Sequence, residues 1–150
     1  MELTRRTLKI QCKPADFGNQ WANEDLIVRM IKTMRQHNGV GLAANQVGER
    51  IRVFVMAIDG HEWACFNPEL LSHNNDIVDF NEGCLSFPGE SCIIKRPNTI
   101  HVRYFDVTGI EIDEELTGLA SRCFQHELDH LNGITMQDRY KEQNAEQSGN

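Results

Sequence analysis

The clearest chemical signal in the sequence is the run His126-Glu127-Leu128-Asp129-His130. On a helix, residues four apart lie on one face with about 5–6 Å between their Cβ atoms, so both imidazoles can reach one metal ion. Glu127 would then lie beside the ion as a candidate acid and base. The competing interpretation is a solvated, charged helix end. The run therefore predicts a metal site that needs further ligands.

A catalytic site of this type uses a third protein ligand and keeps one position open for water. The following segment, LNGITMQDRYKEQN (131–144), contains no histidine and no obvious second helix, so thermolysin-like and metzincin patterns are not matched. Cys84 is the more attractive candidate, because Gly83 and Pro88-Gly89 predict irregular backbone beside a strand. The alternative is that Cys84 is a small buried hydrophobic residue.

A third segment, GVGLAANQVG (39–48), combines small residues with Gln46. Glycine and alanine let the backbone approach a ligand closely, and Gln46 offers an amide donor. The alternative is a helix end followed by a tight loop. A phosphate-binding loop is excluded, because no Gly-Lys-Ser/Thr sequence follows.

Two helices and a strand-rich middle are predicted around these segments. Apolar residues recur at helical spacing within 23–38, where Asn23 is a candidate cap, and a second helix is predicted from Thr117 to Asn132-Gly133. The order helix, strands, helix favours an α+β fold with the sheet packed against helices. Strands are predicted at 51–58, 61–67, 69–71, 91–94, 100–106 and 110–116, with turns at Asp59-Gly60 and Thr108-Gly109.

The chain of 150 residues fits one domain, which we assign to residues 1–140 because no repeat or linker divides it. Residues 141–150 are polar and lack apolar periodicity, so we expect a frayed tail. A hydrophobic content of 40% and a charged content of 25% exclude low-complexity and broadly disordered classes.

Charge and cysteine usage limit the partners and the compartment. A net charge of −7 opposes attraction to nucleic-acid phosphates and anionic membranes, so neither is an expected partner. No apolar run suits a signal peptide or a membrane span, which favours a cytoplasmic protein. The five cysteines lack the spacing of a secreted disulfide framework, so we expect free thiols or a thiolate ligand.

Three segments together resemble the signature motifs of the peptide deformylase family. They are GVGLAANQ (39–46), EGCLS (82–86) and QHELDH (125–130), in this order and at these separations, and NPELL (67–71) adds to the similarity. The resemblance implies an α+β fold in which antiparallel strands pack around a central helix carrying HExxH. It also implies a hydrolase that removes the N-formyl group from the formyl-methionine of nascent polypeptides and releases formate.

Position by position, the resemblance implies that Cys84, His126 and His130 hold one divalent metal ion, with water completing a tetrahedral site. Glu127 becomes the general base and then the general acid. The usual native ion of the family is Fe²⁺, and Zn²⁺, Ni²⁺ and Co²⁺ forms are also known. The sequence does not choose among these ions.

The resemblance also implies substrate contacts. The amide of Gln46 and the backbone N–H of Leu85 would meet the oxyanion of the tetrahedral intermediate, and Gly41 would help to align the substrate. The positions that match the pocket for the methionine side chain could equally be core residues. They are Phe80, Leu119 and Cys123.

This sequence departs from the family pattern at several positions. Arg122 stands where an apolar residue is common, Ser91 where many bacterial members carry arginine, and Asn45 where proline or an aliphatic residue is frequent. Only about ten polar residues follow Tyr140, as in the short deformylases of some bacteriophages, which lack a C-terminal helix. We therefore expect at most a transient contact with the ribosome. We also expect a monomer, with formyl-methionyl peptides as the substrate that the resemblance implies.

Three other functions remain open from the residues alone. An HExxH metallopeptidase would use a third ligand other than Cys84. A non-catalytic, metal-stabilised binding module would use Glu127 only to solvate its helix. A cysteine hydrolase would use Cys84 as its nucleophile.

Overall fold

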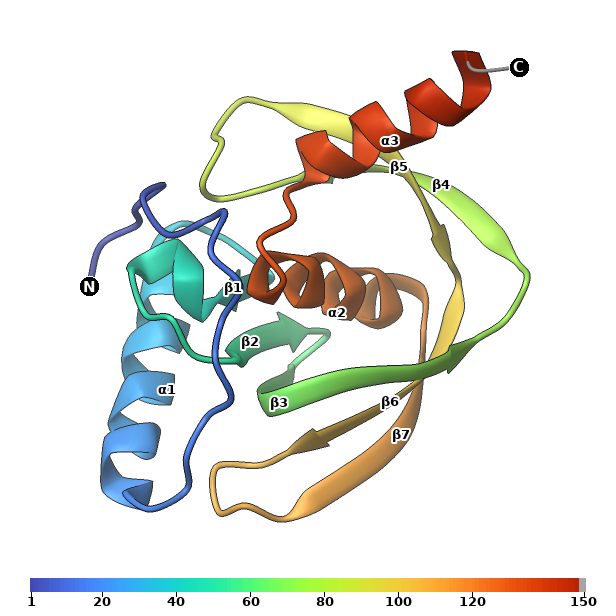
Figure 1. The fold of residues 1–150 in the computed structure, drawn as a ribbon. Helices are drawn as coiled ribbons and strands as arrows, with labels where there is room; N and C mark the ends of the chain where they lie inside the picture. Colours follow the sequence, from blue (N-terminus) through green and yellow to red (C-terminus); the bar gives the residue numbers. More distant parts are fainter. Residues whose placement is uncertain (149–150) are drawn as a thin grey trace.

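Two antiparallel sheets enclose helix α2 (Gly118–Leu131) in the computed structural model, which describes residues 1–148 (Figure 1). One sheet has five strands in the order β1-β2-β3-β6-β7, and the other pairs β4 with β5. The expected α+β class, with antiparallel strands around a central helix that carries HExxH, is confirmed. The strands are β1 (Gly41–Ala43), β2 (Val53–Ile58), β3 (His61–His73), β4 (Ile77–Gly83), β5 (Ser91–Pro97), β6 (Thr99–Phe105) and β7 (Glu111–Thr117). The remaining helices are α1 (Gln20–Gln36), the 3-10 turn η1 (Ala44–Val47) and α3 (Met136–Ser148).

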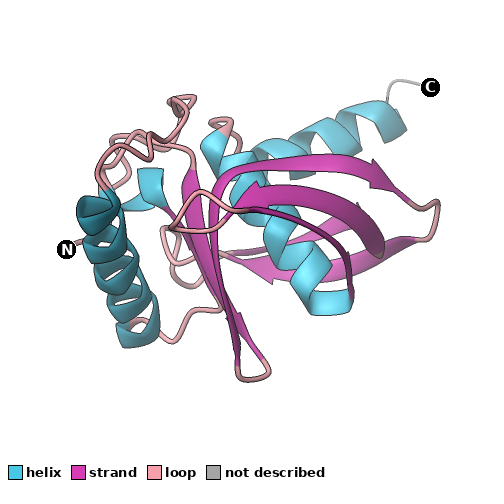
Figure 2. Ribbon diagram, turned by 90° about the horizontal axis from the view of Figure 1, so that it is seen from below, coloured by secondary structure: helices cyan, strands magenta, loops and turns pink. Residues whose placement is uncertain are grey.

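Strand β2 is apolar on both faces because it lies between two helices. Successive side chains of a strand point to opposite faces. Phe54 packs in one core cluster with Phe124 of α2, whereas Val53 and Val55 pack in a second cluster with Met30 of α1. The two clusters place α1 and α2 on opposite faces of the large sheet, and Figure 2 shows α2 among the strands.

Helix α1 begins earlier than the pattern indicated. Its cap is Asn19, whose side chain accepts a hydrogen bond from the Ala22 N–H at 3.0 Å. Asn23, the predicted cap, is buried inside the helix and donates to the Asp16 carbonyl at 2.9 Å. Both asparagines suit a cap by residue type, and the tertiary contact decides which one serves.

The hairpin predicted at Asp59-Gly60 is confirmed, since both residues have positive φ, of 52° and 78°. The strand predicted at 69–71 is part of the longer β3, which continues through irregular pairing with β6 between Phe66 and Ser72. Strand β4 was not predicted, because most of its side chains are exposed and show no alternation.

The expectations of a frayed tail at 141–150 and of a missing C-terminal helix are wrong for the described residues, where α3 runs to Ser148. The helix is fixed to β5 by Gln143, which accepts from the Lys95 N–H at 2.8 Å and donates to the Ile93 carbonyl at 3.2 Å. Polar contacts of this kind leave no apolar periodicity to detect. Residues 149–150 lie outside the described part. No helix within 1–148, α3 included, has the length and apolar character of a membrane crossing.

Candidate metal centre

Three side chains of types that bind metal ions converge on one point. His130 Nε2 lies 3.2 Å from His126 Nε2 and 3.4 Å from Cys84 Sγ, and the three ligand atoms lie within 4.8 Å of one another. Tetrahedral coordination at ordinary bond lengths separates ligand atoms by about 3.4–3.6 Å. The predicted ligand set is therefore brought together at distances that fit a single divalent ion.

The central helix and the end of β4 supply these ligands. His126 and His130 lie one turn apart on α2, and both are buried. Cys84 follows the last residue of β4, where a turn is closed by the Phe87 N–H, which donates to the Cys84 carbonyl at 3.0 Å. The alternative in which Cys84 is an ordinary core residue is wrong, because its side chain is partly exposed and lines a cavity.

The charge around His126 favours a bound cation. Burial opposes an imidazolium, but Glu127, Cys84 and Glu82 together raise the pKa of His126 to about 10. Burial and the neighbouring His126 lower the pKa of His130. The carboxylate and thiol groups around His126 thus form an environment that favours positive charge, as a cation site requires.

Glu127 lies beside the ligand atoms on the same helix. Its Oε1 atom is buried without a hydrogen-bond partner among the described residues, as expected for an atom that faces an ion or its water. Burial raises the pKa of Glu127 to about 7, although the nearby His126 lowers it. A carboxyl group with such a pKa can both accept and donate a proton near neutral pH.

Gln46 reaches the same point from η1. Its Oε1 accepts from the Ala43 N–H at 2.9 Å, and its Nε2 points to Ser86 Oγ at 3.0 Å and Cys84 Sγ at 3.5 Å. The amide group is therefore oriented with its donor toward Cys84 and Ser86. Leu85, the other predicted oxyanion donor, lines the cavity directly after Cys84.

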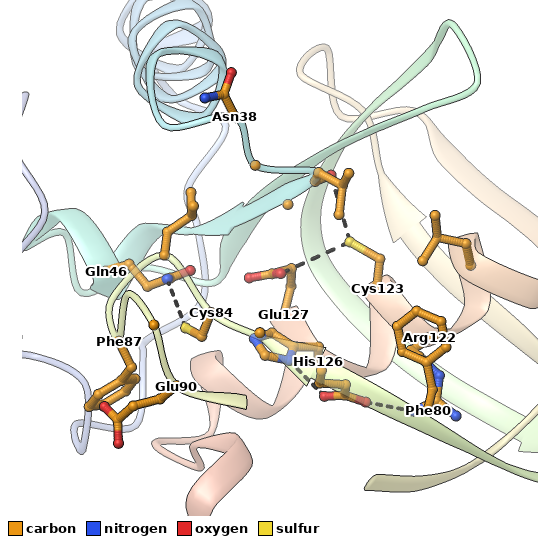
Figure 3. A pocket seen from close by; sticks show the side chains of 18 residues that line it. Asn38, Gln46, Phe80, Cys84, Phe87, Glu90, Arg122, Cys123, His126 and Glu127 are labelled. Atoms are coloured by element: carbon orange, nitrogen blue, oxygen red, sulfur yellow. Dashed lines mark hydrogen bonds and ion pairs between the residues drawn. The ribbon is translucent and has the colours of Figure 1, made fainter. Parts of the chain in front are cut away.

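A cavity of about 370 Å³ opens in front of the ligands (Figure 3). Figure 3 places Gln46 and Cys84 on one side, Phe80 and Arg122 on the other, and Glu127 between them. The four predicted substrate positions all line this cavity, although Phe80 and Leu119 are 47% and 44% exposed. They are Gly41, Phe80, Leu119 and Cys123.

Glu82 was not singled out by the sequence reasoning. Its Oε1 bonds Nδ1 of His126 at 2.9 Å, and its carboxylate also accepts two hydrogen bonds from Arg96 at 2.6 and 3.0 Å. Such a partner fixes the ring and leaves Nε2 for the metal. The sequence contained one indication of this role, because Glu82 is the first residue of the EGCLS segment. Acidic residues at strand ends are common, so its type and position alone did not distinguish it.

Two departures from the family pattern lie away from the cavity walls. The Asn45 side chain donates to the His130 carbonyl and so connects η1 to the end of α2. Ser91 is exposed at the start of β5, opposite Gly83. The third departure, Arg122, is buried in the cavity wall.

The chain matches the family model of polypeptide deformylase over residues 1–146. It is 48% identical over 134 residues to the peptide deformylase of Thermotoga neapolitana, which covers 89% of this chain and 81% of that protein. The crystal structure of peptide deformylase from Thermotoga maritima has a TM-score of 0.86 at 43% identity, covering 90% of this chain and 91% of that one. A Met-Ala-Ser-bound structure of a class I type b peptide deformylase from Acinetobacter baumannii has a TM-score of 0.87 at 30% identity, covering 93% and 97%. The chain belongs to the peptide deformylase family.

Proposed function

We propose that Glu127 moves the protons of a deformylation reaction while Cys84, His126 and His130 hold the metal ion on which that reaction depends. The observation that carries this proposal is the convergence of three ligand atoms next to the unpartnered Oε1 of Glu127. The substrate is a peptide with an N-terminal formyl-methionine, and the products are formate and the free N-terminus.

A divalent ion held by Cys84, His126 and His130 would make a water molecule acidic enough to ionise near neutral pH. Glu127 accepts a proton from the attacking water molecule, whose oxygen forms the new bond to the formyl carbon. Gln46 Nε2 and the Leu85 N–H donate to the oxyanion that forms, and donors of this type contribute about 3 kcal/mol each. Glu127 then returns the proton to the departing amine nitrogen, so its carboxylate is regenerated.

The cavity suits a methionine side chain. Phe80, Leu119 and Cys123 give it apolar walls. Burial, and next the charge of Glu127, raise the pKa of the Cys123 thiol, which therefore stays neutral. The relative from Acinetobacter baumannii holds Met-Ala-Ser, the product expected from a formyl-methionyl peptide, and supports this substrate class.

We further propose Fe²⁺ as the native ion. One thiolate and two imidazoles also suit Zn²⁺, Ni²⁺ and Co²⁺, and intrinsic affinity favours Zn²⁺ over Fe²⁺, so occupancy in the cell follows metal supply. A ferrous ion beside the Cys84 thiolate would make the site sensitive to oxygen.

Three further expectations concern the cellular setting. The first is that the chain acts as a monomer. Nascent chains are made in the cytosol, so we propose that a bacterial or phage-infected bacterial cytosol is the place of action. Any ribosome contact would be transient.

A pair of variants tests the role of Glu127. Glu127→Gln should lower formate release by about 10²–10⁴-fold while the metal content stays near one ion per chain. Glu115→Gln, on the exposed side of β7, is the matched control and should keep both activity and metal. A Glu127→Gln protein that turns over like the wild type would exclude the proposed proton transfer.

The alternatives give different results in companion assays. A metallopeptidase that does not use Cys84 would keep its ion in Cys84→Ala and cleave unformylated peptides. A non-catalytic module would bind metal and release no formate. A cysteine hydrolase would lose activity on alkylation of Cys84 without losing metal. The ligand distances around Cys84 favour metal loss in Cys84→Ala.

A further inference from the structure

Arg122 occupies a place in the cavity wall where charge is unexpected. It lies on α2 one turn before His126, and its side chain is only 9% exposed. Phe80, its neighbour in this wall, has its ring centroid 5.1 Å from the Arg122 guanidinium carbon. The mechanism proposed above does not use Arg122.

The guanidinium of Arg122 is fixed by several acceptors. Nη1 donates to Glu82 Oε2 at 2.7 Å and to the Ile94 carbonyl at 3.0 Å, and Nη2 donates to the Val78 carbonyl. These bonds attach α2 to β4 and β5 at the same time. A long side chain held at its far end by three acceptors cannot swing away easily, so it forms a rigid part of the wall.

A second cavity of about 240 Å³ lies behind this wall. Phe80, Leu119 and Arg122 line both cavities, while Val78 and Pro97 line only the second one. The three shared residues therefore form the boundary between the space in front of the metal ligands and the space behind. Arg122 is the member of the boundary that is buried and hydrogen-bonded, whereas nearly half of the surface of Phe80 and of Leu119 is exposed.

We propose that Arg122 is a specificity-determining residue, which closes the far end of the pocket for the first side chain of the substrate and so limits its length. This inference rests on the proposed function, because it assigns the front cavity to that side chain. Removal of the Arg122 side chain would join the two cavities and admit longer unbranched side chains, whose extra methylene groups would be buried against Val78 and Pro97.

The test compares kcat/KM for formyl-Xaa-Ala-Ser peptides in which Xaa is methionine or a residue with an unbranched eight-carbon side chain. The wild type should prefer methionine by about 10-fold or more, and Arg122→Ala should reduce or reverse this preference by a similar factor, mainly through KM for the long substrate. The ratio of the two substrates within one protein cancels differences in folded fraction and metal content. Arg103→Ala, on the exposed side of β6, is the matched control and should keep the wild-type ratio.

Arg122→Met is a second variant that separates lost volume from the lost hydrogen bond. It removes the bond to Glu82 but fills most of the space that the Arg122 side chain occupies. It should keep the preference for methionine. A wild type that accepts the eight-carbon side chain as well as methionine would overturn the proposal even if Arg122→Ala did not fold. An unchanged ratio in folded Arg122→Ala would overturn it as well. Absence of formate release from either substrate by the wild type would instead contradict the proposed function.

Discussion

Gln46 and Ala43 are joined by a hydrogen bond of 2.9 Å that sets the direction of the Gln46 side-chain amide. The Ala43 N–H donates to Oε1, so Nε2 is left as the group that faces Cys84 and Ser86. The glutamine is nearly completely buried, and no rotation of the amide is needed to present a donor. A donor oriented before substrate binds is the arrangement that stabilises an oxyanion most effectively.

Replacement of Gln46 by glutamate tests this arrangement. Gln46→Glu keeps the acceptor for Ala43 but exchanges the Nε2 donor for an oxygen, so kcat should fall by about 10²–10³-fold. Gln36→Glu, at the exposed end of α1, is the control. Steady-state formate release with matched metal content measures the effect. A kcat within twofold of the wild type would show that Gln46 does not meet the oxyanion.

Gly41 should not tolerate a side chain. A Cβ atom built there would lie 2.6 Å from Cys123 Sγ and 2.6 Å from Glu127 Oε2, and both atoms are on the buried helix α2. Gly41→Ala should therefore displace Glu127 and lower kcat/KM by about 10²-fold, as misplacement of catalytic groups by about 1 Å can do. Gly18→Ala meets only the exposed Asp16 side chain and serves as the control. Full activity of Gly41→Ala would contradict the close packing of Gly41 against Glu127.

The middle of HELDH contributes to stability through Asp129. Its buried carboxylate accepts from Arg96 at 2.9 Å and from Arg139 of α3 at 2.7 and 2.9 Å. Asp129→Asn replaces the second of the two buried carboxylates that pair with Arg96 by a neutral amide and should lower the free energy of unfolding by about 3 kcal/mol. Asp113→Asn removes an exposed ion pair with Arg103 and should cost no more than about 0.5 kcal/mol. Urea denaturation measures the free energy of unfolding of both variants. Equal midpoints for Asp129→Asn and Asp113→Asn would contradict the stabilising role of the buried Asp129 ion pairs.

The turn between β6 and β7 adds a pH-dependent component to stability. Slight burial opposes ionisation of Asp106, but hydrogen bonds from the Thr108 hydroxyl and from backbone N–H groups, including that of Ile110, lower its pKa. Because the folded-state pKa is the lower one, the stabilisation is present above the unfolded-state value of about 4 and is lost as pH falls through the folded-state value. Asp106→Asn can still accept these bonds but cannot ionise. In denaturant titrations, the unfolding free energy of Asp106→Asn should therefore rise relative to that of the wild type as the pH falls from 7 to 3. A difference that stays constant with pH would contradict a lowered pKa of Asp106 in the folded protein.

The central part of the site was accessible from the sequence. The spacing of His126, Glu127 and His130 on a helix predicted a metal site from the sequence alone. The central position of that helix was expected only from the family resemblance. Cys84 was accessible only through its neighbours and the family resemblance, because a single cysteine has no spacing to argue from. The structure adds that Cys84 Sγ lies 3.4 Å from His130 Nε2, a distance that suits two ligands of one ion.

Other features could not be read from local patterns. Asn19 rather than Asn23 caps α1, because the Asn23 side chain is hydrogen-bonded to the Asp16 carbonyl. Helix α3 depends on contacts of Gln143 with a strand about 50 residues earlier in the chain. The burial of Arg122 depends on Glu82, which lies 40 residues away. Polar contacts over such separations leave no periodic signal in the sequence.

Formate release from formyl-Met-Ala-Ser is the most direct test of metal-dependent deformylation by this chain. The protein would be purified anaerobically, loaded with Fe²⁺ or Ni²⁺, and assayed before and after chelation. The structure predicts rapid release that disappears with the chelator and returns when the ion is restored. No formate from folded protein that holds one ion per chain would contradict the account.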